Sequence, residues 1–135
     1  MRFMAEKKSV DLNLEFNGMI DQKVNGDSLR LKQILINLLS NAIKYTDKGH
    51  VTLSAKLDEQ LNNFLLTVTV KDTGSGIPKN KQAKLFSPYY QAGGQKPGTG
   101  LGLYLCRQLV KLQGGTIDLE SEEGQGCTVR FTIPY

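Results

Sequence analysis

The sequence predicts an α+β domain: a two-layer sandwich in which a mixed, mostly antiparallel five-stranded sheet is covered on one face by about three helices. Segments in which apolar and polar residues alternate, as in half-buried strands, are interspersed with segments of helical periodicity. The predicted strands do not alternate strictly with helices, as they would in a wholly parallel sheet. A chain of 135 residues is long enough for one domain with its own hydrophobic core.

The first half of the chain contains three predicted strands and one long helix. Residues 10–16 alternate as a strand, and the polar segment 17–26 has room for a short strand near Val24. Asp27 is a good N-cap for a helix that runs to about Tyr45, with Gly49 just past its last turn. Strands are predicted at 50–57 and 64–70, joined by the polar loop 58–63.

The second half begins with a turn after the strand at 64–70 and a short helix within 78–86. Residues 87–100 contain four glycines and two prolines, which indicates a loop. Helical periodicity returns at 101–112, and Gly114 and Gly115 end that helix. Two strands, 116–119 and 127–133, follow and are joined by the turn 122–126.

The charge distribution suggests an anionic partner. The net charge is only +4, but no Asp or Glu occurs from Thr73 to Ile117, while six Lys or Arg residues fall within this stretch. Nucleic acid and polyphosphate both fit such a stretch. Aromatic residues make up 7% of the chain and there is no Trp, so the stacking platforms of single-stranded nucleic-acid binders are poorly represented. Polyphosphate is therefore the better candidate.

The two cysteines, Cys106 and Cys127, belong to no metal-binding pattern and do not make a disulfide framework. A reducing compartment, hence a cytoplasmic location, is the simplest interpretation. No apolar run approaches 18 residues, so we expect no direct membrane contact by this domain.

The turn DTGSGIP at 72–78 is the first candidate site. Asp72 ends an apolar strand, and Gly74 and Gly76 allow positive φ angles and close approach of a flat ligand. The carboxylate could accept a hydrogen bond from an exocyclic amine. Equally, the segment could be a simple strand-to-helix turn with a polar cap.

A second candidate lies on the helix at 28–45. Asn37, Asn41 and Lys44 fall on one helix face, where amide oxygens suit Mg²⁺ and the ammonium suits a phosphate. Arg30 and Gln33 share this face, so it could also be simply the solvated side of the helix.

Two further glycine-rich segments and one histidine complete the candidates. The segment GTGLG at 98–102 precedes a helix, whose free amides would favour phosphate, but it lacks the residues of a Walker A or dinucleotide fingerprint. The segment GQGCT at 124–128 could be only a hairpin turn. His50 opens a strand without a flanking carboxylate, so we expect a structural role for it.

Taken together and in this order, these motifs resemble the N, G1, F, G2 and G3 boxes of sensor histidine kinases. The matching stretches are NLLSNAIKY (37–45), DTGSG (72–76), LF (85–86), GTGLGL (98–103) and GQGCT (124–128). The whole chain, 1–135, resembles the single catalytic ATP-binding domain of that family, the Bergerat fold shared with gyrase, Hsp90 and MutL.

The resemblance implies a role for each matching residue. Asp72 would bind the adenine amine, the turn would lie against adenine, and Thr128 would complete that site. Asn37 and Asn41 would hold Mg²⁺ and phosphates, and Asn37 and Lys44 would be catalytic. Residues 78–100 would be the ATP lid. The implied nucleotide-binding residues are Asn37, Asn41, Lys44, Tyr45, Asp72, Gly74, Gly76, Ile77, Phe86, Lys96, Gly98, Thr99, Gly100, Leu101, Gly102, Leu103 and Thr128.

The resemblance also implies the reaction and the partners. The domain would transfer the γ-phosphoryl group of MgATP to a histidine on a separate dimerisation hairpin, whose phosphoacceptor motif has no match in this chain. A response regulator receiver domain would act downstream, and the full-length kinase would be a membrane-anchored homodimer. A gyrase- or Hsp90-like ATPase and an anti-sigma-type serine kinase are the alternatives. Asn37 argues against the ATPase, because an amide cannot act as the base that activates water.

Overall fold

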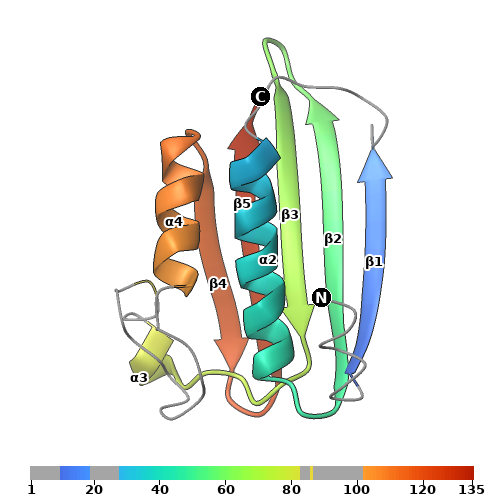
Figure 1. Ribbon diagram of the computed structural model, residues 1–135, viewed down its shortest axis with the longest axis vertical. Helices are drawn as coiled ribbons and strands as arrows, with labels where there is room; N and C mark the ends of the chain where they lie inside the picture. The colour runs from blue at the N-terminus through green and yellow to red at the C-terminus, as the bar shows by residue number, and fades with distance from the viewer. Residues whose placement is uncertain (1–9, 19–27, 83–85, 87–101) are drawn as a thin grey trace.

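The computed structural model describes residues 10–18, 28–82, 86 and 102–135. Its five strands and three helices are shown in Figure 1. The strands are β1 (Val10–Gly18), β2 (Gly49–Glu59), β3 (Phe64–Asp72), β4 (Thr116–Glu122) and β5 (Gly126–Pro134); the helices are α2 (Ser28–Lys44), α3 (Lys79–Gln82) and α4 (Gly102–Leu112).

The five strands form one sheet in the order β1-β2-β3-β5-β4. β1 pairs with β2 in parallel, because α2 crosses over between them, and the other three pairs are antiparallel. The predicted mixed, mostly antiparallel five-stranded sheet is therefore confirmed. The C-terminal end of β3, the turn between β4 and β5, and the C-terminal end of α2 all lie at the lower end of the molecule in Figure 1.

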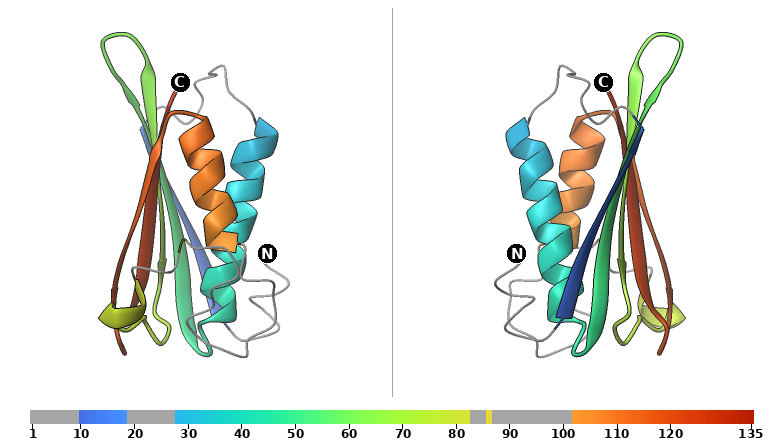
Figure 2. Two further views of the ribbon diagram at one scale, coloured as in Figure 1. Left: turned by 90° about the vertical axis from the view of Figure 1, so that its left-hand side faces the viewer. Right: turned by 90° about the vertical axis from the view of Figure 1, so that its right-hand side faces the viewer.

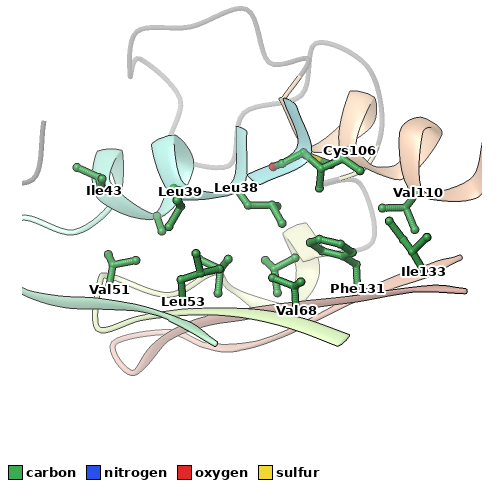
Figure 3. Packing of buried hydrophobic residues seen from close by; sticks show 14 of the residues in the cluster. Leu38, Leu39, Ile43, Val51, Leu53, Val68, Cys106, Val110, Phe131 and Ile133 are labelled. Carbon is green, nitrogen blue, oxygen red and sulfur yellow. The ribbon is translucent and has the colours of Figure 1, made fainter. Parts of the chain in front are cut away.

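Helices α2 and α4 cover one face of the sheet, as the two side views in Figure 2 show. The apolar stripe of α2 packs on the side chains of β2 and β3, and α4 packs over β5 (Figure 3). The side chains with no exposed surface include Ile34, Ile43, Val51, Cys106, Val110, Phe131 and Ile133. Burying a side chain of this kind stabilises the fold by about 1.5–3 kcal/mol, so this single core sets the position of the residues at its lower end.

The predicted boundaries differ from the structure in a few places. The helix predicted within 78–86 is described only as the single turn α3, and the predicted strand near Val24 lies outside the described residues. The strand predicted at 116–119 extends to Glu122. α2 ends at Lys44, so Gly49 is not its cap; this glycine begins β2 with φ 125°. In the described part of the chain, no helix is long and apolar enough to cross a membrane.

Candidate functional site

Asp72 is the last residue of β3 and one of the few buried polar side chains in the described residues, with 8% of its surface exposed. Its side chain lies on the helix-covered face of the sheet, because it follows Val68 and Val70 at intervals of two. The Asp72 Oδ1 atom accepts a hydrogen bond from the Gly74 amide at 2.9 Å. The Cys127 amide of β5 also donates to this carboxylate.

Burial raises the pKa of Asp72, and the hydrogen bonds from Gly74 and Cys127 only partly offset this. The protein thus holds a carboxylate in a place where ionisation is costly. Such an arrangement favours a ligand that donates a hydrogen bond to the carboxylate.

The turn after Asp72 packs tightly against two neighbouring segments. A Cβ atom on Gly74 would collide with the carbonyl oxygen of Tyr45, just beyond α2. Gly76 has φ 71°, and a Cβ there would collide with the carbonyl of Glu122. Glycine is thus required at both positions, by space at Gly74 and by space and backbone conformation at Gly76.

Hydrogen bonds join this turn to the β4–β5 hairpin. The Ile77 amide donates to the Ser121 Oγ atom at 2.8 Å, and Ser121 Oγ donates to the carbonyl of Gly126 at 2.8 Å. The Gly124 amide donates to the carbonyl of Ser75 at 2.6 Å. We call Asp72, Gly74, Gly76, Ile77, Ser121 and Cys127 the carboxylate end of the candidate site.

The structure does not bring Thr128 to Asp72, which corrects the prediction that Thr128 completes this site. Asp72 is paired with Cys127, whereas Thr128 is paired with Lys71. Since neighbouring residues of a strand point to opposite faces, Thr128 lies on the face that the helices leave uncovered. Cys127 shares the face of Asp72, and burial together with the Asp72 charge raises the pKa of its thiol to about 12.

Asn37 and Asn41 lie on the side of α2 that meets α4. The Asn37 side chain forms a hydrogen bond with the thiol of Cys106. Burial raises the pKa of this thiol to about 12. Cys106 Sγ also donates to the carbonyl of Ile34 at 3.7 Å. A Cβ atom on Gly102 would lie 3.2 Å from Asn41 Nδ2, so the start of α4 rests against this amide.

We call Asn37, Asn41 and Gly102 the amide end of the candidate site. It lies close to the carboxylate end, because the Tyr45 amide donates to the Asn41 carbonyl at 3.1 Å and the Tyr45 carbonyl abuts Gly74. The structure therefore brings the first two predicted motifs together with the last glycine of the fourth.

The remaining predicted site residues fall into three groups. The Lys44 ammonium lies 5.1 Å from the centre of the Tyr45 ring, and burial raises the Tyr45 pKa. The Arg107 guanidinium lies 5.9 Å from the Phe86 ring, while Leu103 packs against the hydrophobic core. Lys96, Gly98, Thr99, Gly100 and Leu101 lie outside the described residues.

His50 is the second residue of β2 and is exposed. Its backbone amide donates to Thr73 Oγ1 at 3.0 Å, and its carbonyl accepts from the Thr73 amide at 3.2 Å. These hydrogen bonds join the start of β2 to the turn that follows β3. Within the described part of the chain, no group of three or more His, Cys, Asp or Glu residues could hold a metal ion.

Sequence reasoning missed Ser121, Gln82 and Cys127. The Gln82 Nε2 atom donates to the carbonyls of Ile77 and Ser121, at 2.8 and 2.9 Å. A serine in a strand and a glutamine in a short helix carry no signal by themselves. For Cys127, the register between β3 and β5 is the missing information.

Comparisons with known proteins identify the family of this chain. The family described as histidine kinase-, DNA gyrase B-, and HSP90-like ATPase matches residues 26–135. The chain is 42% identical over 134 residues to the aerobic respiration control sensor protein ArcB of Escherichia coli K12, and 42% identical over 135 residues to the sensor histidine kinase RcsC of Salmonella typhimurium. These matches cover 96% and 97% of this chain but only 17% and 14% of the relatives.

Two solved structures are similar over nearly the whole chain. The catalytic domain of histidine kinase ThkA has a TM-score of 0.76 at 32% identity, covering 98% of this chain and 85% of that one. Full-length ShkA in complex with AMPPNP has a TM-score of 0.82 at 29% identity, covering 96% of this chain and 26% of that one. The chain therefore belongs to the family of histidine kinase-, DNA gyrase B-, and HSP90-like ATPases and is homologous to the catalytic ATPase domains of sensor histidine kinases.

Proposed function

We propose that this domain binds MgATP between the carboxylate end and the amide end and donates its γ-phosphoryl group to a histidine on a separate domain. The observation that carries the proposal is the buried Asp72 carboxylate, set beside a glycine turn that abuts the helix bearing Asn37 and Asn41. One helical turn separates Asn41 from Tyr45, whose carbonyl contacts the turn.

At the carboxylate end, Asp72 would accept a hydrogen bond from the adenine amine. A hydrogen bond to a charged group contributes about 1.5–3 kcal/mol. Guanine presents a carbonyl oxygen at the same position, which would face the carboxylate without a proton between them. The buried carboxylate therefore supports selection of adenine over guanine.

At the amide end, Asn37 and Asn41 fit a magnesium ion that arrives with the nucleotide. Their neutral amide oxygens suit this ion, and the described residues contain no carboxylate cluster that would bind it alone. When bound, Mg²⁺ would neutralise charge on the phosphate oxygens. Lys44 would add a positive charge beside the phosphates, and the amides of 98–102 would donate to them.

The proposed reaction is in-line transfer, in which this chain supplies position and charge rather than a nucleophile. Asn37 cannot take a proton, so activation of water at this position is not expected. The acceptor histidine would lie on the dimerisation hairpin of the same kinase, with a response regulator receiver domain downstream. We propose that the full-length protein is a homodimer and that this domain lies on the cytoplasmic side of the membrane.

Calorimetric titration with ATP and GTP, followed by incubation with γ-labelled ATP, tests the proposal. The chain alone should bind ATP in preference to GTP and acquire no acid-labile label. Adding a separate dimerisation hairpin with its histidine should produce labelled hairpin, weakly because the tether is missing.

A His50→Ala variant is the control for labelling of the domain itself. Label on the domain that disappears in His50→Ala would make His50 the acceptor and overturn the proposed transfer to another domain. Equal affinity for ATP and GTP would overturn the proposed role of Asp72.

A further inference from the structure

Ile77 has both of its backbone polar groups held by side chains from other elements. Its amide donates to Ser121 Oγ at 2.8 Å, and its carbonyl accepts from Gln82 Nε2 at 2.8 Å. The same Gln82 nitrogen also donates to the Ser121 carbonyl at 2.9 Å. Ser121 of β4 therefore holds both backbone groups of Ile77: it binds the amide directly, and it holds the carbonyl through Gln82.

We propose that Ser121 and Gln82 are positioning residues that set the geometry of the carboxylate end for the base of the nucleotide. This inference rests on the proposed function. Neither residue needs to touch the nucleotide, because both act through Ile77 and the glycine turn that precedes it.

The turn needs such support because its own sequence is permissive. Gly74 and Gly76 lack the Cβ atom that would restrict the backbone, and Gly76 adopts φ 71°. Proline at position 78 restricts Ile77 to extended conformations but leaves the Ile77 amide without a helical partner. Ser121 supplies that partner and thereby limits where residues 74–77 can lie.

Ser121 also connects this turn to the strand beside Asp72. Its hydroxyl proton goes to the Gly126 carbonyl at 2.8 Å, so its oxygen is left to accept from Ile77. Ser121 is paired across the sheet with Cys127, whose amide donates to Asp72. The Ser121 hydroxyl thus links the glycine turn to the start of β5, the two segments that would face a base bound at Asp72.

The test compares Ser121→Ala with Thr116→Val at the other end of β4. Thr116 makes a hydroxyl–hydroxyl hydrogen bond of 2.8 Å with Thr132. The control therefore also removes one hydroxyl from the same strand, but far from the turn. The readouts are ATP and GTP affinity by calorimetry and the melting temperature without ligand.

Ser121→Ala should weaken ATP binding by about 2- to 12-fold, the effect of one hydrogen bond, and narrow the preference for ATP over GTP. Thr116→Val should keep both the ATP affinity and the preference for ATP over GTP at the wild-type level. Ser121→Thr, which retains the hydroxyl, should restore affinity and selectivity. Unchanged nucleotide binding in Ser121→Ala, or an equal loss in Thr116→Val, would overturn the inference.

Gln82→Glu provides an independent test should Ser121→Ala fail to fold. This change keeps the shape of the side chain but places an acceptor against the carbonyls of Ile77 and Ser121, so ATP affinity should again fall. Wild-type affinity in Gln82→Glu would contradict the inference. A wild-type chain that does not bind ATP would overturn the proposed function itself, whereas tight wild-type binding with insensitive variants would overturn only this inference.

Discussion

The carboxylate end and the amide end of the candidate site are held in place by different means. At the carboxylate end, backbone groups are fixed by hydrogen bonds with Ser121, Gln82 and Gly124, and two glycines leave no room for a Cβ atom. At the amide end, two side chains project from α2, and Gly102 of α4 approaches one of them closely. The first end is held mainly through its backbone, whereas the second presents side chains from a packed helix.

This difference predicts how each end responds to substitution. Changes at the carboxylate end should disturb folding and binding together, because the ligand-facing backbone is also part of the fold. Changes at the amide end should alter binding while the helices remain packed. The following variants test this contrast, in order of decreasing expected effect.

Gly76→Ala should lower the free energy of unfolding by about 2–5 kcal/mol. A left-handed conformation costs a non-glycine residue about 1–2 kcal/mol, and the collision with the Glu122 carbonyl adds about 1–3 kcal/mol. Gly124→Ala is the control, since Gly124 also has a positive φ of 83° but nothing within 4 Å of its added Cβ. Urea unfolding should show a loss of only about 1–2 kcal/mol there; equal losses would contradict the close packing of the turn.

Asp72→Asn should weaken ATP binding by about 10- to 150-fold, equivalent to about 1.5–3 kcal/mol. The amide keeps the shape of the side chain but presents a donor where an acceptor is needed. Calorimetry with ATP measures the effect. An affinity within twofold of wild type would show that Asp72 does not bind the base.

The same variant should reveal the cost of ionising Asp72. Because burial raises the folded-state pKa above its ordinary value of 3.8, the protonated form is favoured by folding. The wild type should therefore gain stability relative to Asp72→Asn as the pH falls through the raised pKa, and lose it as the pH rises. Urea unfolding of both proteins between pH 4 and 8 checks this; a relative stability that falls on acidification would contradict it.

Gly102→Ala should leave the free energy of unfolding within about 1 kcal/mol of wild type, because alanine favours helix over glycine and the neighbouring atoms belong to a side chain. The added Cβ would press on the Asn41 amide at 3.2 Å and displace it. MgATP affinity should therefore fall by about 2- to 12-fold, the effect of one hydrogen bond. Gln108→Ala on the exposed side of α4 is the control, and a fall of equal size there would point to a general effect on the helix.

The smallest expected effect concerns thiol labelling, which should be almost absent in the folded chain at neutral pH. Burial raises the pKa of both Cys106 and Cys127 to about 12, so fewer than about one thiol in ten thousand is ionised near pH 7.5. A disulfide reagent should react slowly with the folded chain and rapidly in urea. Rapid reaction of the folded chain at Cys127 would show that the carboxylate end is open to solvent, and rapid reaction at Cys106 would show the same for the contact between α2 and α4.

The fold was predictable because its signals are local. Alternating apolar residues along 50–57 and 64–70, and the apolar stripe of the long helix, reflect burial on one face of each element. The differences occur at element ends, such as the segment after α2, where Gly49 begins β2 instead of ending the helix. There the competing turn at Thr46, whose Oγ1 donates to the Ala42 carbonyl at 2.7 Å, decides the boundary.

The site was only partly predictable because it depends on pairings between distant segments. The motifs around Asn37 and Asp72 have distinctive residues, and the structure brings them together. By contrast, the choice between Cys127 and Thr128 depends on the register of β5 against β3. Ser121 bonds to a residue 44 positions earlier, and no pattern within β4 indicates that partner.

The strand order has a consequence for how the domain folds. The pairs β2–β3 and β4–β5 are local hairpins, but β3 and β5 meet only after the intervening segment with α3 and α4 has been closed into a loop. Closing such a loop costs chain entropy before any contact is gained, so the pairing of β3 with β5, here called the joint, should form late. Asp72 and Cys127 lie on opposite sides of the joint. A ligand bound there would bridge the two hairpins and slow their separation, so bound nucleotide should retard unfolding more than it accelerates folding.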